Sequence, residues 1–188
     1  MPPTDPVRFV IITTPQSDVA ARIDEARRTV CRIGASQASL AYPPHVTLRT
    51  GTLVPLLQLP EFIHEFGELI GRWEPFRIRI NGLWQATYRD REQMKHLVGY
   101  RIHEDPELMA MNERLLTFTR WRASNRLRYE PHLTLAFDDL NPEGFARVGR
   151  WIRENPRALP AGFEWRFDNI GLYRLEGHQW RPYRVWRA

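Results

Sequence analysis

A seven-residue pattern occurs twice in this chain, and the repeat constrains the fold more than any other feature. The first copy, at residues 42–48, reads YPPHVTL, and the second, at residues 129–135, reads YEPHLTL. Self-similarity of this kind indicates that one supersecondary unit has been used twice. We therefore predict two similar lobes related by a pseudo-twofold axis.

A predicted helix follows each copy of the pattern. Residues 60–73 and residues 141–155 both carry apolar side chains at helical spacing. In the second segment Asn141 is the expected N-cap and Pro142 the first helical residue, which is a common arrangement at a helix start. The two copies therefore share more than the short pattern itself.

Predicted strands complete each copy. They are recognised by alternation or by enrichment in aromatic and β-branched residues, and they lie at residues 74–85, 96–103, 162–175 and 181–187. One strand of each copy contains Gly-Leu followed by an aromatic residue. Trp84 lies 39 residues after His45, and Tyr173 lies 41 residues after His132. These nearly equal offsets support a duplicated unit.

The complete element order predicts an α+β protein. A strand at 7–13 and a helix at 17–33 precede the first copy, and a helix near 106–121 leads into the second. We expect two pseudo-twofold-related lobes with mainly antiparallel sheets around a central cleft and helices on the outside. Each lobe should contain strand, helix, motif strand, helix, strand and strand. Because no linker interrupts the sequence, residues 1–188 are expected to form a single two-lobed domain. The approximate motif repeats are residues 42–103 and 129–187.

The histidine and threonine of each pattern are the candidate catalytic residues. Side chains alternate along a strand, so His45 and Thr47 should share one face, and His132 and Thr134 should do the same. If the two strands are adjacent, two imidazoles and two hydroxyls converge on one cleft. One histidine can then accept a proton while the other donates one, and the threonines can donate hydrogen bonds to phosphate oxygens. A duplication kept for structure alone is the alternative.

Arg49 extends the first pattern by one more alternation. Strict alternation places it on the face of His45 and Thr47, whereas the matching position of the second copy is Ala136. Arg49 is therefore a candidate phosphate contact. A solvated arginine at a strand end is an equally simple explanation.

Composition narrows the class of protein and the compartment. The net charge of +5 comes from 26 arginines and the single lysine, Lys95, and guanidinium groups suit phosphate recognition, although a base-composition bias explains the arginines equally well. Cys31 is the only cysteine, which fits the cytoplasm and excludes an intramolecular disulfide. We expect no membrane span. The remaining histidines form no recognisable metal spacing, so neither a metal nor another cofactor is expected.

The paired motifs resemble those of the two-histidine (2H) phosphoesterase superfamily, the LigT-like or 2'-5' RNA ligase-like proteins. This family is defined by two H-x-[ST]-x motifs in two lobes, and HVTL at 45–48 and HLTL at 132–135 both match. The resemblance implies hydrolysis or formation of bonds to ribose phosphates, typically the opening of 2',3'-cyclic phosphates. It also implies that the two motif histidines are the acid–base pair and that the two threonines hold the phosphate.

Aromatic and basic residues near the motifs are the candidate substrate contacts. Tyr42, Trp84, Tyr129 and Tyr173 could stack on a base, although core packing explains any one of them as simply. The basic segment 120–128 would suit a groove for an RNA backbone, or it is a solvated loop.

Several functions remain open from the sequence. The leading prediction is a metal-independent phosphoesterase that hydrolyses 2',3'-cyclic phosphates or 2'-5' phosphodiesters of RNA ends or nucleotides. RNA 2'-5' ligation, hydrolysis of cyclic oligonucleotides and non-catalytic RNA binding are the alternatives. The expected partner is RNA or a small nucleotide, and the oligomeric state is open.

Overall fold

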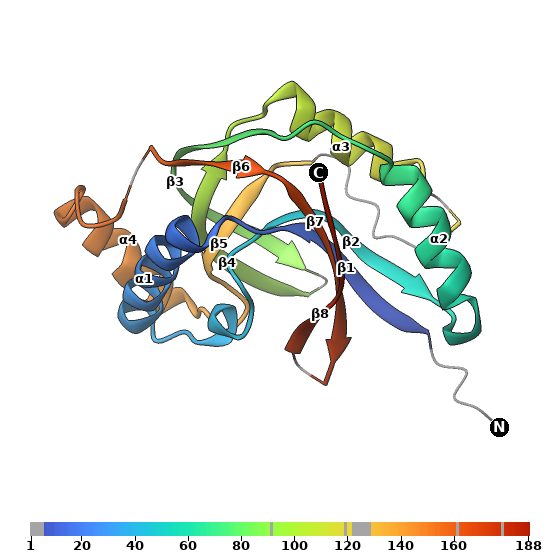
Figure 1. Ribbon diagram of the computed structural model, residues 1–188. Helices are drawn as coiled ribbons and strands as arrows, with labels where there is room; N and C mark the ends of the chain where they lie inside the picture. Colours follow the sequence, from blue (N-terminus) through green and yellow to red (C-terminus); the bar gives the residue numbers. More distant parts are fainter. Residues whose placement is uncertain (1–5, 91, 119, 122–128, 161, 178) are drawn as a thin grey trace.

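The computed structural model describes residues 6–90, 92–118, 120–121, 129–160, 162–177 and 179–188. In these residues the protein is α+β: helices lie on the outside of a curled sheet whose strand pairs are all antiparallel (Figure 1). The strands are β1 (Val7–Thr13), β2 (Val46–Val54), β3 (Phe76–Asp90), β4 (Gln93–Ile102), β5 (His132–Ala136), β6 (Glu164–Phe167), β7 (Asn169–Glu176) and β8 (Gln179–Arg187). The α-helices are α1 (Ser17–Gly34), α2 (Leu59–Ile70), α3 (Pro106–Leu116) and α4 (Pro142–Glu154).

The two motif strands lie side by side at the centre of the sheet. The strand order is β6-β3-β4-β5-β2-β1-β7-β8, and β5 and β2 pair through Val46 and Leu133. Outward from this pair, one lobe has the order β2-β1-β7-β8 and the other has β5-β4-β3-β6. The predicted pseudo-twofold arrangement is thus confirmed, with its axis between the two motif strands.

The lobes do not correspond to the two halves of the chain, and in this respect the sequence prediction is wrong. Strand β3 follows the first motif but pairs with β4 beside the second motif, and β7 follows the second motif but pairs with β1. Strand β4 joins β5 in the way that β1 joins β2. Strand β4 therefore begins the second unit and does not close the first.

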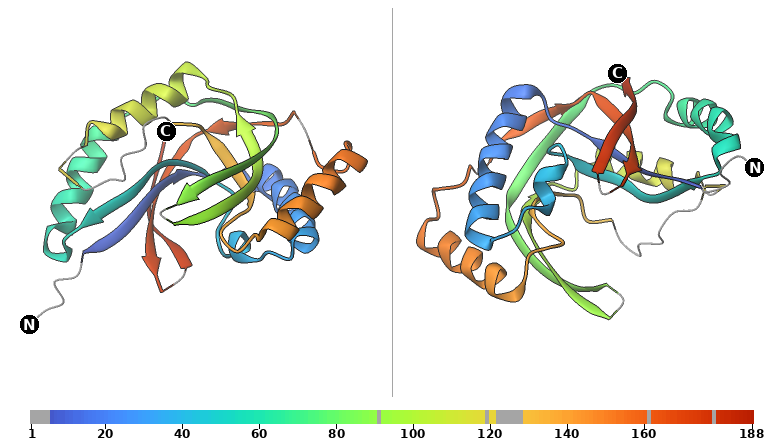
Figure 2. Two further views of the ribbon diagram at one scale, coloured as in Figure 1. Left: turned by 180° about the vertical axis from the view of Figure 1, so that it is seen from behind. Right: turned by 90° about the horizontal axis from the view of Figure 1, so that it is seen from below.

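The helices are exchanged in the same way. Helix α1 precedes β2 in sequence but packs on β5 and on α4, while α3 precedes β5 but packs on β2 and on α2. Figure 2 shows the two helix pairs on the two lobes. A close contact of glycines joins α1 to α4, because a Cβ on Gly144 would lie 2.1 Å from the Gly34 carbonyl oxygen. The lobes are therefore interlocked through both strands and helices.

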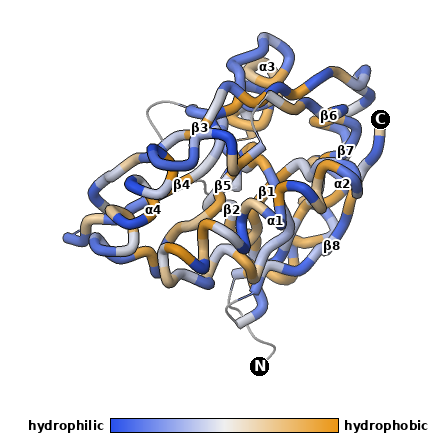
Figure 3. The backbone as a smooth tube through the Cα atoms, turned by 90° about the vertical axis from the view of Figure 1, so that its left-hand side faces the viewer, coloured by the Kyte–Doolittle hydropathy of each residue, from blue (hydrophilic) through white to orange (hydrophobic). Residues whose placement is uncertain are grey.

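The main core lies between the sheet and the helices. The residues between the motif positions, Val46, Leu48, Leu133 and Leu135, are at most 1% exposed and belong to this core. Figure 3 shows hydrophobic segments gathered on β5, β2 and β1, with hydrophilic segments towards the periphery. The alternation predicted for the motif strands is thus confirmed at these positions, and it leaves the other face of the sheet for the site.

Most predicted elements are present with shifted ends. Asn141 caps α4, because its side chain accepts a hydrogen bond of 2.7 Å from the Gly144 amide. The strand predicted at 162–175 is divided at Asp168, where the chain passes from β6 in one lobe to β7 in the other. Helix α3 ends at Leu116, earlier than predicted. No helix within the described residues is long and apolar enough to cross a membrane.

Candidate active site

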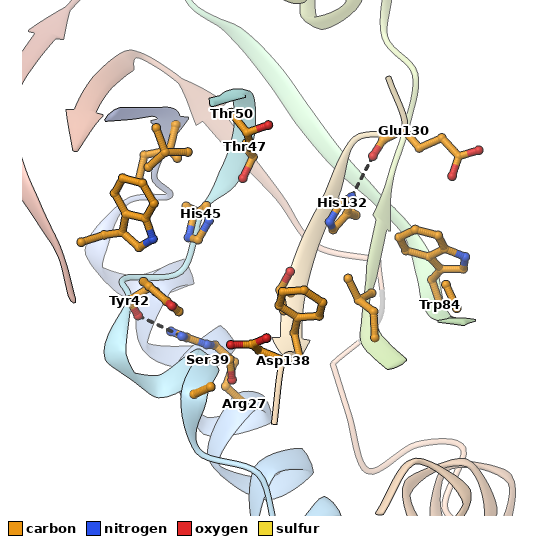
Figure 4. Close-up of a pocket in the computed structure, with 18 of the residues that line it drawn as sticks. Arg27, Ser39, Tyr42, His45, Thr47, Thr50, Trp84, Glu130, His132 and Asp138 are labelled. Atoms are coloured by element: carbon orange, nitrogen blue, oxygen red, sulfur yellow. Dashed lines mark hydrogen bonds between the residues drawn. The ribbon is translucent and has the colours of Figure 1, made fainter. Parts of the chain in front are cut away.

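The four predicted catalytic residues line one cavity on the face of the sheet opposite the main core. His45, Thr47, His132 and Thr134 all contribute to its wall, and its volume is about 880 Å³. In Figure 4, His45 and Thr47 lie on one side of the cavity and His132 on the other. The structure therefore brings together side chains that are far apart in the sequence.

The pairing of β2 with β5 fixes the arrangement of these residues. Because Val46 is opposite Leu133 in an antiparallel pair, the same register places His45 across from Thr134 and Thr47 across from His132. The histidines are thus diagonal neighbours, and diagonal Cβ atoms in such a pair lie about 7–8 Å apart. A phosphate between the two imidazoles would have one threonine on each side.

Both imidazoles are held in the same way. His45 Nδ1 is 2.8 Å from the Pro43 carbonyl oxygen, and His132 Nδ1 is 2.8 Å from the Glu130 carbonyl oxygen. A carbonyl can only accept a hydrogen bond, so Nδ1 must carry the proton in each ring. In a neutral ring Nε2 is then unprotonated and can act as a base. The proline before each histidine belongs to the short turn that supplies this contact.

The environment of His45 favours its neutral form. Burial of the ring lowers the pKa of His45 to about 4; the hydrogen bond to Pro43 opposes this shift, and the charges of Arg27 and His132 add to it. Arg27 is 2% exposed and pairs with Asp24 at 2.7 Å. His45 is therefore neutral at pH 7.

Arg27 also positions the segment that leads into the first motif. Its second terminal nitrogen donates a 2.9 Å hydrogen bond to the Tyr42 carbonyl oxygen (Figure 4). Arg27 comes from α1, a helix that packs mainly on the other lobe. The buried arginine therefore links the first motif to both lobes.

Arg49 is not in the cavity, so the predicted phosphate contact is corrected. Thr47 pairs with Ile12 and Arg49 pairs with Ile11, so β2 has one residue more than β1 between these pairs. This β-bulge at Leu48 breaks the alternation and turns Arg49 to the core face. Its guanidinium is 5% exposed and donates to the carbonyl oxygens of Leu115, Phe118 and Trp121. Thr50 takes the expected place in the cavity wall.

The predicted aromatic contacts divide into two groups. Tyr42, Trp84 and Tyr173 line the cavity, whereas Tyr129 does not. Tyr129 packs against the main core, burial raises its pKa, and its hydroxyl donates a 3.0 Å hydrogen bond to the Thr47 carbonyl oxygen. Tyr129 thus holds the first motif strand and is not a stacking surface. The predicted basic segment lies outside the described residues from 122 to 128.

Sequence reasoning missed several residues of the cavity wall. Tyr88 shares a strand face with Trp84 by simple alternation, so the pattern of β3 contained a signal for it. Trp180 lies in the last strand, and nothing in the repeat pattern marked it. Arg27 and Thr50 depend on helix packing and on the bulge, which have no local sequence signature.

Candidate metal ligands are not grouped in the described residues. No cluster of three or more His, Cys, Asp or Glu side chains there could hold a metal ion. His64 and Glu68 form an exposed pair at 3.5 Å on α2, and within the described part of the chain no further ligand joins them. Metal independence stays a prediction that a chelator can test.

Comparisons with known proteins agree with the fold and the site. The model of the 2'-5' RNA ligase superfamily matches residues 15–179. A predicted phosphoesterase of Bacillus thuringiensis (strain Al Hakam) is 24% identical over 148 residues, covering 77% of this chain and 78% of the relative. The E. coli LigT structure complexed with 3'-AMP has a TM-score of 0.65, with 18% identity and coverage of 97% and 98% of the two chains. A protein of Thermus thermophilus has a TM-score of 0.63, 17% identity and coverage of 96% and 97%.

Two interlocked lobes with a histidine and a threonine on each of two central strands define a protein of the two-histidine phosphoesterase class. The chain belongs to the 2'-5' RNA ligase superfamily, because the family model covers most of its length. The resemblance drawn from the two motifs alone is thereby confirmed.

The altered place of Arg49 gives a direct prediction. Arg49→Met should lower the free energy of unfolding by about 2–4 kcal/mol, because buried carbonyl groups lose their donors. Urea denaturation measures this change, and Thr50→Val is a matched control on the same strand, expected to change stability by less than about 1 kcal/mol. An Arg49→Met protein of normal stability with weakened phosphate binding would contradict the structural role.

Proposed function

We propose that the chain is a metal-independent phosphoesterase that hydrolyses 2',3'-cyclic phosphate or 2'-5' phosphodiester bonds of RNA ends or nucleotides. The observation that carries the proposal is the diagonal placement of His45 and His132 across the paired motif strands. This arrangement puts a proton acceptor and a proton donor on either side of one phosphate site. Two groups of this kind are what acid–base catalysis of phosphoester hydrolysis requires.

The two histidines take different roles in this proposal. His45 is neutral at pH 7, so its Nε2 accepts a proton from the attacking water. His132, with Nδ1 bound to the Glu130 carbonyl, carries its second proton on Nε2 and gives it to the leaving ribose oxygen. The water oxygen forms a bond to phosphorus as the bond to the ribose oxygen breaks. Each histidine is returned to its starting state by exchange of one proton with solvent.

The threonines steady the phosphate. Thr47 and Thr134 line the cavity beside the histidine of the opposite strand. Their hydroxyls can donate to the non-bridging oxygens, on which negative charge increases during attack. The pseudo-twofold arrangement gives one such donor on each side of the phosphate.

The related proteins support a nucleotide or RNA substrate. The curated Bacillus relative is described as a phosphoesterase, and LigT has been seen complexed with 3'-AMP, ATP, phosphate and NADP+. We carry this preference over to the present chain as part of the proposal. A cytoplasmic location fits a chain whose single cysteine, Cys31, is a buried free thiol. Ligation, cyclic oligonucleotide hydrolysis and simple RNA binding remain the alternatives to test.

Substitution of either histidine tests the mechanism. His45→Ala and His132→Ala should each lower kcat/KM by about 10²–10⁴-fold on a nucleoside 2',3'-cyclic phosphate with EDTA present. Product chromatography measures turnover and separates hydrolysis from ligation. His64→Ala is the matched control, because this histidine is exposed on α2 outside the cavity. Full activity of either motif variant, or loss of wild-type activity in EDTA, would refute the proposal.

The pH dependence tests the assignment of the base. Because a base must be unprotonated, kcat/KM should fall on the acid side as His45 becomes protonated, near pH 4 and not near pH 6.5. A fall on the alkaline side is expected when His132 loses its donated proton. Initial rates between about pH 3.5 and 9 measure both limbs. An acid limb near pH 6.5 would show that a neutral His45 is not the base.

A further inference from the structure

An apolar patch on the cavity side of the sheet is not used by the proposed chemistry. Val10, Ile12 and Tyr173 form a buried cluster that is separate from the main core, and Trp180 packs against them. All four line the cavity, and we call them the β1/β7 patch. They lie on the His45 side, because β1 pairs with β2 and β7 pairs with β1.

A second aromatic patch lies on the His132 side. The Trp84 ring is 5.2 Å from the His132 ring, and the Arg101 guanidinium lies 5.4 Å from the Trp84 ring centre. Tyr88 and Phe137 stack at 6.0 Å with an interplanar angle of 18°. Trp84, Tyr88 and Phe137 line the cavity, and we call them the β3 patch.

The two patches are related by the pseudo-twofold arrangement of the sheet. Strand β3 lies second from β5, and β7 lies second from β2, so Trp84 and Tyr173 occupy corresponding strands. Each aromatic also lies beside a glycine: Trp84 pairs with Gly99, and the Tyr173 ring lies 2.7 Å from where a Gly171 Cβ would be. The missing side chains leave room for the rings. An aromatic surface therefore flanks the phosphate site on both sides.

A substrate with one base would leave one of these patches uncovered. A nucleoside cyclic phosphate has a single base, whereas the cavity of about 880 Å³ is near the upper end of the roughly 300–1,000 Å³ typical of small-ligand pockets. Aromatic side chains bind bases of any sequence by stacking. Two patches with the catalytic groups between them match a phosphate that carries a base on each side.

We infer that the cavity has two base subsites and that its preferred substrate is a phosphodiester that joins two nucleosides. The inference rests on the proposed function, which places the leaving ribose beside His132. The base of the leaving nucleoside then stacks on the β3 patch, and the other base lies on the β1/β7 patch. Hydrolysis adds water to phosphorus and releases one nucleoside, so the phosphate stays on the other.

Substrate preference tests this inference. The wild-type protein should hydrolyse adenylyl-(2'→5')-adenosine with a kcat/KM at least about tenfold higher than that for adenosine 2',3'-cyclic phosphate, since stacking of one base contributes about 1–3 kcal/mol. A preference for the cyclic mononucleotide, or equal values, would overturn the inference.

Two tryptophan variants locate the subsites. Trp180→Ala should reduce the dinucleotide preference by about tenfold, whereas Trp84→Ala should lower kcat/KM for both substrates by similar factors. Trp180→Leu keeps apolar bulk without the ring and should behave as Trp180→Ala does. Tyr183→Ala is the matched control, because this aromatic is 44% exposed on β8 and is not part of the cavity wall. An unchanged preference in both Trp180 variants would overturn the assignment of the β1/β7 patch.

A binding measurement separates failure of this inference from failure of the proposed function. Calorimetry with the His45→Ala/His132→Ala double variant should give a Kd for the dinucleotide at least about tenfold below that for the cyclic mononucleotide. Tight dinucleotide binding without any wild-type turnover would refute the proposed function and retain the two subsites. Turnover with equal affinities for the two ligands would retain the proposed function and refute the two subsites.

Discussion

The antiparallel pairing of β2 with β5 is the contact on which the site depends. The Val46–Leu133 pair turns both apolar side chains into the core, and this leaves the residues on either side of them to face the cavity. One register therefore sets the positions of both histidines and both threonines. A shift of one residue would exchange the two faces of a strand, burying the polar residues and exposing the apolar ones. The buried core and the site are specified by the same pairing.

The exchange of elements between the lobes keeps this pairing in place. Strands β3 and β7 cross to the opposite lobes, and α1 and α3 each cover the motif strand of the other copy. Arg27 adds a polar link from α1 to the turn before His45, and Tyr129 adds one from the start of the second motif to the Thr47 carbonyl. Separation of the lobes would break all these contacts together. The catalytic groups are thus held by elements from both halves of the chain.

The sequence predicts the parts of this account that depend on local pattern. Alternation correctly assigns His45, Thr47, His132 and Thr134 to one face, and the cap at Asn141 follows from residue preference. The partners of each strand are set by long-range packing, so the exchange of β3 and β7 could not be read from the repeat. The face predicted for Arg49 was wrong for a related reason: a bulge adds one residue to β2, and no local residue choice indicates it.

The state of the two imidazole rings is the central claim, and nuclear magnetic resonance tests it most directly. Long-range ¹H–¹⁵N spectra of the free protein should show the Nδ1–H tautomer for His45 and for His132 when the rings are neutral, because both Nδ1 atoms donate to carbonyl oxygens. The His45 ring should stay neutral as the pH is lowered to about 5, because its pKa is lowered to about 4. An Nε2–H tautomer in either ring, or protonation of His45 near pH 6.5, would contradict the account.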